Sequence, residues 1–137
     1  GLGDIFSVRI AGNIVNEDIL GSMEFACKVA GAKAVVVLGH SKCGAVKGAC
    51  DHVEMGNLTN LLSKLQPAVY AEKTITDDRT SSNDVFVEKV ATLNVLMAMH
   101  QIHEKSTILN DMIIKGEIAL IGGMYDVETG IVDFYED

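Results

Sequence analysis

A histidine and a cysteine three positions apart are the residues of this sequence best suited to chemistry. His40 and Cys43 follow the apolar run Ala34–Leu38 and precede a stretch of small residues that begins at Gly44. Imidazole and thiolate together suit zinc, which takes four ligands in tetrahedral geometry. The spacing alone fits a buried cysteine and a hydrogen-bonded histidine in a turn equally well. Two side chains are also only part of a zinc site.

The expected secondary structure around this pair favours the metal site. Ala34–Leu38 is short and uniformly apolar, which is typical of a strand buried on both faces of a parallel sheet. In open α/β sheets, ligands bind beyond the carboxyl ends of the strands, and His40 and Cys43 lie there. Cys43 is also expected near the start of a helix, whose positive end favours the thiolate.

The other cysteines and two of the histidines are weaker candidates for metal ligands. Cys50 lies two helical turns beyond Cys43, about 10 Å away along a helix, and is interpreted as a core residue. Cys27, on another helix with apolar neighbours, is interpreted in the same way. His100 and His103 share a helix at a spacing that permits a common metal. No cysteine or third histidine stands near them, so a solvated helix end is favoured.

Composition and charge exclude several classes of protein. The chain has 137 residues, of which 48% are hydrophobic and 5% aromatic, and it fits one domain, residues 1–137, with an aliphatic core. Its formal net charge of -8 argues against nucleic acid or an anionic membrane surface as partner. No apolar run approaches the roughly 18 residues of a membrane span. Three cysteines are an odd number for a disulfide framework, so reduced thiols or thiol ligands are expected.

Hydrophobic periodicity predicts strands that alternate with helices. Besides Ala34–Leu38, strands are predicted at Phe6–Ile10, Glu117–Ile121 and Ile131–Tyr135. Helices are predicted from the cap Asn16 to Gly31, from Cys43 to about Val53, over Leu58–Leu65 with an interruption near Pro67, along a stripe of Phe86, Val90, Leu93 and Met97, and from the cap Ser106 to Gly116. His52 is expected at the surface and residues 72–84, with the acidic run Asp77–Asp84, in a solvated loop. The order indicates an α/β fold in which helices flank a mostly parallel central sheet.

Several longer motifs resemble those of the β-class carbonic anhydrases. They are "GDIF" (Gly3–Phe6), "VRIAGNIV" (Val8–Val15), "GHSKCGAVKGA" (Gly39–Ala49) and "GGMYDVETGIV" (Gly122–Val132). They occur in the family's order, the likeness covers nearly the whole chain, and G-H-x-x-C-G is specific in this context. One departure is Ile10, where Asn is common in the family.

The resemblance implies a fold, a reaction and a cofactor. The implied fold has a sheet of order 2-1-3-4 with a last, antiparallel strand at its edge. The implied enzyme is a lyase that hydrates carbon dioxide reversibly to bicarbonate and a proton, by attack of zinc-bound hydroxide. His40 and Cys43 match two of the three protein ligands of the Zn²⁺, and Gly44 would offer its backbone to the substrate. A homodimer or homotetramer is also implied, for which Ile131–Tyr135 is the candidate pairing edge.

The family's remaining zinc ligand, a cysteine, belongs to a C-x-D-x-R motif that has no counterpart in this sequence. The Asp and Arg of that motif position and deprotonate the water, so no catalytic residue is assigned within the chain, and the pair is expected upstream of Gly1. In the family the motif follows the first strand, which lies between the second and third. Phe6–Ile10 and Ala34–Leu38 would then flank an empty position, whose unpaired backbone is costly against a total stability of about 5–15 kcal/mol. We therefore expect an upstream segment in the natural protein, in preference to a partner chain, to fill it.

Other functions are compatible with the same motifs. A truncated homologue that binds zinc poorly, or that serves as an assembly partner, would be non-catalytic, and the zinc content per chain distinguishes it from the enzyme. Hydrolysis of an analogue such as carbon disulfide would use the same metal ligands. A structural zinc module would need four protein ligands, of which two can be named. The expected location is the cytoplasm, whereas a secretion signal on an upstream segment would place the protein in the periplasm.

Overall fold

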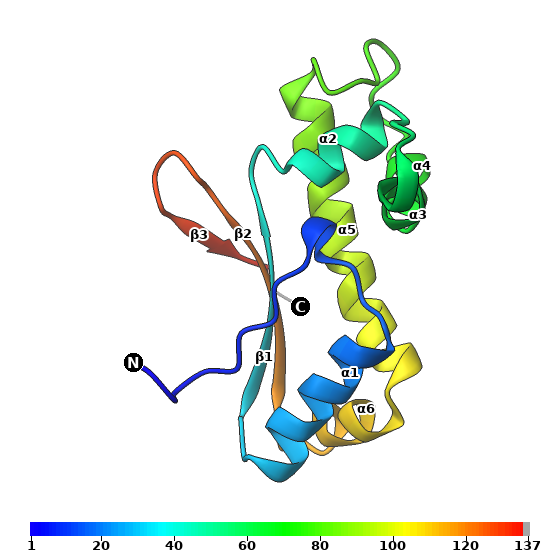
Figure 1. The fold of residues 1–137 in the computed structure, drawn as a ribbon. Helices are drawn as coiled ribbons and strands as arrows, with labels where there is room; N and C mark the ends of the chain where they lie inside the picture. Colours follow the sequence, from blue (N-terminus) through cyan, green and yellow to red (C-terminus); the bar gives the residue numbers. More distant parts are fainter. Residues whose placement is uncertain (136–137) are drawn as a thin grey trace.

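The computed structural model describes residues 1–135, and its sheet and helices form separate layers (Figure 1). The three-stranded sheet has the order β1-β2-β3. Its strands are β1 (Ala34–His40), β2 (Ala119–Tyr125) and β3 (Val132–Phe134). β1 and β2 are parallel, whereas β3 pairs antiparallel with β2 at the edge. The predicted α/β class and the antiparallel edge strand are therefore confirmed.

The helices lie on one side of this sheet (Figure 1). They are α1 (Glu17–Glu24), α2 (Gly44–Cys50), α3 (Gly56–Ser63), α4 (Gln66–Ala71), α5 (Asp84–Lys105) and α6 (Thr107–Ile114). A 3₁₀ turn, η1 (Ala11–Asn13), precedes α1, and a π-helical turn, η2 (Phe25–Val29), extends α1. Among the described residues, no helix combines the length and the apolar composition that crossing a membrane requires.

The two predicted N-cap residues, Asn16 and Ser106, cap the helices α1 and α6 through their side chains. Asn16 Oδ1 accepts a hydrogen bond from the backbone N–H of Ile19 (2.9 Å), and Ser106 Oγ accepts one from that of Leu109 (3.1 Å). Each bond satisfies a donor that the first turn of a helix leaves free. The Ser106 hydroxyl also donates to Glu24 Oε2 (2.7 Å), which ties α6 to α1.

The long helix α5 packs the core against the sheet. Of its predicted apolar stripe, Phe86 and Val90 are fully buried, while Leu93 and Met97 are partly buried against the core. Val95 of the same helix packs closely against Gly39 of β1, where a larger side chain would collide with it. This helix therefore holds the strand that ends at the candidate metal ligands.

The prediction that Ala34–Leu38 is buried on both faces is wrong. Val35 and Val37 are buried, whereas Val36 is 49% and Leu38 42% exposed. The physical reason is that, in the described part of the chain, helices cover only one face of the sheet (Figure 1). A uniformly apolar strand thus leaves a row of apolar side chains on the open face.

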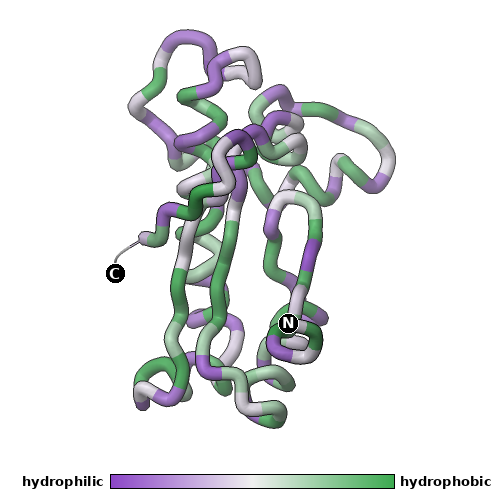
Figure 2. Tube along the Cα trace, turned by 90° about the vertical axis from the view of Figure 1, so that its left-hand side faces the viewer, coloured by the Kyte–Doolittle hydropathy of each residue, from purple (hydrophilic) through white to green (hydrophobic). Residues whose placement is uncertain are grey.

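The prediction of a strand at Phe6–Ile10 is also wrong, because residues 1–10 form neither strand nor helix. In Figure 2 the N-terminal segment runs alongside the two long strands but apart from them. It lies on the side of β1 away from β2 (Figure 2) and does not pair with β1. Extended backbone becomes a strand only when a neighbour completes its hydrogen bonds, and within residues 1–135 this segment has no such neighbour.

A cavity of about 720 Å³, here called the slot, separates this segment from β1. Its lining includes Ile5, Phe6, Val8 and Ile10 from the segment and Ala34, Val35 and Val36 from β1. The predicted empty position beside β1 is thus present in the structure as a cavity with apolar side chains on both sides.

Pairing moves the limits of the other predicted strands. β2 runs from Ala119 to Tyr125, not from Glu117 to Ile121, because its parallel register with β1 continues as far as His40. The Ile131–Tyr135 prediction shortens to Val132–Phe134. The first residues of the predicted turn "GGMYDVETG" are therefore strand.

The helix limits differ more modestly. The helix after Cys43 ends at Cys50, short of the predicted Val53. The break near Pro67 falls before it, and Pro67 stands in the first turn of α4, where its missing N–H costs nothing. The helical segment that starts at Asn16 ends, as predicted, at Gly31, whose φ of 85° suits glycine.

The loop at residues 72–84 is organised around a buried carboxylate, Glu72. Glu72 Oε1 accepts hydrogen bonds from the Thr74 hydroxyl and the Thr74 backbone N–H (3.0 Å). Oε2 accepts from the backbone N–H of Ile75 (3.1 Å) and from Arg79 (3.3 Å). The loop was predicted from its polarity alone, and Glu72 orders its first part, while Asp78 accepts hydrogen bonds from the Thr80 and Ser82 hydroxyls further along.

We expect Glu72 to make the protein sensitive to acid. The Thr74 hydroxyl, ahead of the backbone N–H groups, lowers the pKa of Glu72 from 4.5 to about 2. The unfolded chain therefore binds more protons between these values, so the stability that Glu72 contributes is complete above pH 4.5 and lost as the pH falls through about 2. Urea midpoints measured from pH 7 to pH 2 should fall less steeply for Glu72→Gln than for the wild type. Asp77→Asn, at an exposed carboxylate in the same loop, is the control, and an equal change in slope would contradict the assignment.

Candidate metal centre

The connection between β1 and α2 carries both predicted zinc ligands. β1 ends at His40, α2 begins at Gly44, and Cys43 is the residue that caps the helix, with φ −63° and ψ 121°. The two side chains therefore lie at the carboxyl end of a parallel strand, the position at which α/β sheets bind ligands.

The imidazole of His40 has one nitrogen free for a metal. Its Nδ1 lies 2.8 Å from the backbone oxygen of Ser41. A carbonyl oxygen only accepts, so Nδ1 carries the proton and donates it, which leaves the lone pair on Nε2. A hydrogen bond of this kind orients metal-binding histidines and fixes their tautomer.

His40 and Cys43 line one cavity of about 780 Å³, here called the metal cavity. Gly44, the predicted substrate-binding residue, lines it too, and a Cβ on Gly44 would meet nothing within 4 Å. The side of Gly44 on which a Cβ would stand is therefore open. The other lining includes Arg9, Ile10, Gly12, Asn13, Leu38, Ala91, Asn94, Val95, Tyr125 and Val127.

The donor atoms are of the kinds that zinc prefers, but the described chain supplies fewer of them than a zinc site needs. Nitrogen from His40 and sulfur from Cys43 are ligands that zinc prefers. Over residues 1–135, no group of three or more His, Cys, Asp and Glu side chains is arranged to hold a metal. The described chain thus offers two of the four positions of a tetrahedral site.

The comparisons with known proteins decide the family. The sequence model of the family described as carbonic anhydrase matches residues 1–132. This chain belongs to the β-carbonic anhydrase family. Carbonic anhydrase 2 of Mycobacterium tuberculosis is 32% identical over 137 residues, which cover 95% of this chain and 62% of that protein. The chain therefore spans about 62% of the length of that curated relative.

Two further matches bear on the fold and on the reaction. A tetrameric β-carbonic anhydrase of Sordaria macrospora superposes with a TM-score of 0.85 at 24% identity, covering 100% of this chain and 71% of that one. A carbon disulfide hydrolase of Acidithiobacillus thiooxidans is 35% identical over 54 residues, 39% of this chain and 25% of that protein. The first match shows that the chain has the fold of that enzyme.

The cysteines that were set aside as ligands lie in the core. Cys50 is 1% exposed, and burial raises the pKa of its thiol to about 11. Cys27 is also buried, which raises the pKa of its thiol. Both thiols are therefore protonated near neutral pH, unlike a zinc ligand. Their interpretation as core residues is confirmed.

The remaining histidines make contacts of their own. His100 is exposed, with Nε2 3.8 Å from Glu104 Oε2. His103 Nδ1 lies 2.8 Å from Asn110 Oδ1. His52 is exposed, as predicted. In the described residues these side chains belong to helix and turn surfaces and not to the metal cavity.

Two asparagines of the metal cavity were missed in the sequence. Asn94, buried on α5, donates to the backbone oxygen of Gly12 (2.6 Å) and so holds η1 over the cavity. An amide on the otherwise apolar, buried side of this helix was the available signal. Asn13 lines both the metal cavity and the slot, and its buried Nδ2 has no hydrogen-bond partner in the described structure. Its position in "VRIAGNIV" was the signal there.

Gly39 allows β1 to approach α5 closely, immediately before the candidate ligand His40. A Cβ on Gly39 would lie 2.7 Å from Val95 Cγ2, a branched side chain with little freedom to move. We expect Gly39→Ala to lower the free energy of unfolding by about 1–3 kcal/mol and to weaken zinc binding, because the end of β1 must shift. Urea unfolding and zinc titration measure the two effects. Gly21→Ala, where a Cβ meets nothing within 4 Å, is the control and should not destabilise; a stable, zinc-binding Gly39→Ala variant would contradict the prediction.

Proposed function

We propose that the protein containing this chain catalyses the zinc-dependent, reversible hydration of carbon dioxide to bicarbonate and a proton. The observation that carries the proposal is the placement of His40 and Cys43, in a chain of the β-carbonic anhydrase family, at one strand end and on one cavity. Zinc, when bound, supplies Lewis-acid chemistry that makes water a nucleophile near neutral pH, for which carbonic anhydrase is the well-known example.

The chain's own residues bind and orient. Nε2 of His40 and Sγ of Cys43 are the proposed ligands, and the Nδ1–H bond to Ser41 O sets the plane of the imidazole ring. Gly44 presents its backbone to carbon dioxide in the open part of the metal cavity. The apolar side chains of Leu38, Ala91 and Val95 suit an uncharged, apolar substrate.

We further propose that a strand of the longer natural protein fills the slot and brings the remaining zinc ligand and the acid–base pair. One edge of β1 has no partner strand in the described residues. Val8, Ile10 and Asn13 line both the slot and the metal cavity, so a strand in the slot would end beside His40 and Cys43. The unpartnered Nδ2 of Asn13 is a hydrogen-bond donor ready for that strand.

The working protein is proposed to be a homo-oligomer. Val36 and Leu38 expose apolar side chains on the open face of the sheet, and Ile131 and Phe134 are each 60% exposed beside its free edge. Single exposed apolar residues are ordinary, but a contiguous set marks an interaction surface. The tetrameric Sordaria macrospora enzyme, which shares this fold, supports this proposal.

A second candidate is a non-catalytic homologue. The described chain offers two zinc donors, whereas a structural zinc module needs four protein ligands, so the non-catalytic homologue is the better alternative of the two. Metal analysis and stopped-flow assays of the natural full-length protein separate this candidate from the enzyme. We expect near one zinc per chain, together with carbon dioxide hydration that is lost on chelation and restored by zinc. A protein without zinc or activity would be the non-catalytic homologue. A zinc protein that hydrolyses carbon disulfide and leaves carbon dioxide unchanged would show that the proposed substrate is wrong.

A further inference from the structure

We infer that Ser41 is a positioning residue that clamps the loop of the metal ligands to the connection between β2 and β3. The inference rests on the proposed function, because it takes His40 and Cys43 to be zinc ligands. Ser41 stands between them and does not itself have to touch metal or substrate.

All three polar groups of Ser41 are engaged. Its backbone N–H donates to the oxygen of Tyr125 (2.9 Å), and its Oγ accepts from the backbone N–H of Val127 (3.0 Å). Its carbonyl oxygen accepts the Nδ1–H of His40. One residue thus joins the end of β1, the ring of the histidine and the start of the β2–β3 connection.

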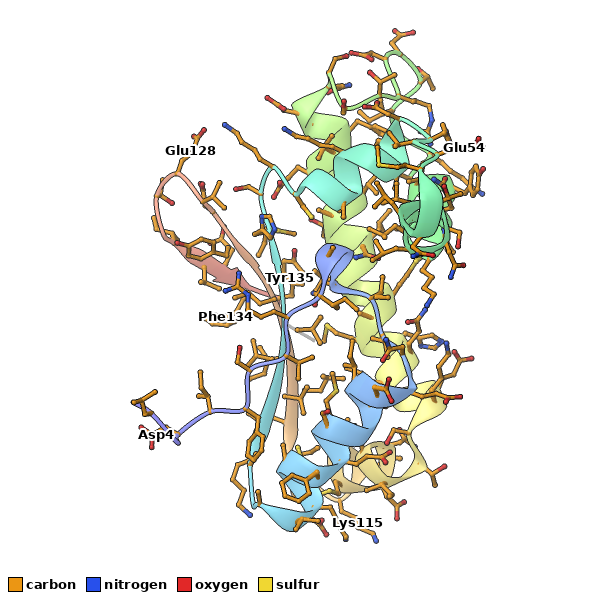
Figure 3. The ribbon with its side chains drawn as sticks, viewed as in Figure 1. Asp4, Glu54, Lys115, Glu128, Phe134 and Tyr135 are labelled. Atoms are coloured by element: carbon orange, nitrogen blue, oxygen red, sulfur yellow. The ribbon has the colours of Figure 1, made fainter. Side chains whose placement is uncertain are left out.

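The backbone of the ligand loop needs such a support. Lys42, between the two ligands, has a φ of 54°, a left-handed conformation that a lysine rarely adopts. Residues in such conformations persist only where their surroundings hold them. The Lys42 ammonium also pairs with Glu128, but both side chains are at least half exposed, and exposed pairs hold geometry weakly. Figure 3 shows Glu128 at the tip of the β2–β3 connection, beside the loop that follows β1.

The partner surface for Ser41 is itself well defined. Asp126 donates its backbone N–H to Ile131 O and accepts from Gly130, each at 2.8 Å. Its Oδ1 accepts from the backbone N–H of Glu128 (2.8 Å). These bonds close the turn, so the N–H of Val127 is held in place for the Ser41 hydroxyl. The clamp therefore joins the ligand loop to a hydrogen-bonded turn that lies 86 positions away in sequence.

The clamp gives Ser41 a role in metal binding that differs from a general role in stability. Its hydroxyl contacts an exposed amide, which water can satisfy when the hydroxyl is removed. Removal of the hydroxyl should therefore change the orientation of the His40 and Cys43 side chains, and it should lower the free energy of unfolding of the whole protein only slightly. Removal of an outer partner of a metal ligand typically weakens metal binding by about 10–100-fold.

The test compares Ser41→Ala, Ser41→Thr and Ser63→Ala in the natural full-length protein. Ser63 is the matched control, because its hydroxyl donates to the backbone oxygen of Asn60 within the exposed surface of α3 and lines neither the slot nor the metal cavity. Zinc affinity is measured by competition with a chelator, the visible spectrum of the cobalt-substituted protein reports ligand geometry, and hydrogen exchange of the Val127 amide in the metal-free protein reports the clamp itself.

We expect Ser41→Ala to bind zinc about 10–100-fold more weakly, to alter the cobalt spectrum and to speed exchange at Val127, with Ser41→Thr close to the wild type and Ser63→Ala unchanged. Wild-type zinc affinity and spectrum in Ser41→Ala would overturn the inference, as would an equal loss in Ser63→Ala. A wild type that binds zinc without hydrating carbon dioxide would overturn the proposed reaction and leave the clamp standing. A wild type that binds no zinc would overturn both.

Discussion

Cys43→Ala and His40→Ala should each leave the natural protein almost free of zinc and reduce carbon dioxide hydration more than 100-fold, beyond the roughly 10–100-fold effect of losing an outer partner. Each change removes one of the two side chains that line the metal cavity with a suitable donor atom. The thiolate is also the stronger neutraliser of the metal charge, so Cys43→Ala should be the more severe. Metal analysis after gel filtration and stopped-flow hydration measure the two losses.

Cys50→Ala is the matched control for Cys43→Ala, because it removes a thiol from the same helix region without touching the metal cavity. Cys50 belongs to the core, and its thiol is kept protonated by burial. The variant should keep its zinc and its activity while unfolding at lower urea, by on the order of 1 kcal/mol for the small cavity left behind. Zinc loss in Cys50→Ala, or full zinc content in Cys43→Ala, would contradict the assigned ligand pair.

What the sequence predicted correctly about this fold is local. Asn16 and Ser106 start helices because each side chain bonds a backbone N–H three residues later. His40 and Cys43 fall at a strand end because the apolar run and the helix that follow one another in sequence bracket them. Such features depend on neighbours within a few residues, which are visible in the sequence itself.

The features that were predicted wrongly from the sequence depend on residues that are distant along the chain. Val36 and Leu38 have the composition of buried residues, but whether anything covers them is settled by where the helices pack. The role of Ser41 was invisible for the same reason, since its partner Val127 lies 86 positions away. Asn94 and Gly12, separated by 82 positions, are a further case. The strand-end position of the candidate ligands could therefore be predicted from the sequence, whereas the side chains that hold them in place could not.

Phe6–Ile10 shows both a local sequence pattern and the lack of a distant partner. Its alternating pattern is that of a strand, yet among residues 1–135 it pairs with no strand across the slot. We expect residues 1–137 expressed alone to be less stable than the natural longer protein by at least about 3 kcal/mol, or roughly 10 °C in Tm. Covering one aliphatic side chain fully contributes about 1.5–3 kcal/mol, and Ile5, Val8 and Val36 are all exposed at or beside the slot. Calorimetry and zinc content of the two proteins test this.

A variant of Asn13 shows whether an inserted strand is the cause of that difference. Asn13 has a φ of 54° and a buried Nδ2 without a partner in the described residues, so Asn13→Gly removes the donor and keeps a residue that tolerates the conformation. In residues 1–137 alone, the change removes an unsatisfied buried group, and only the added backbone freedom of glycine opposes it. In the longer protein it should cost an additional 0.5–1.5 kcal/mol or so, the net value of a hydrogen bond to the inserted strand. The glycine backbone is common to both proteins, so it cancels in the comparison. Equal changes in the two proteins, or equal stability of the two wild types, would mean that no strand occupies the slot and that the remaining zinc ligand reaches His40 and Cys43 by another path.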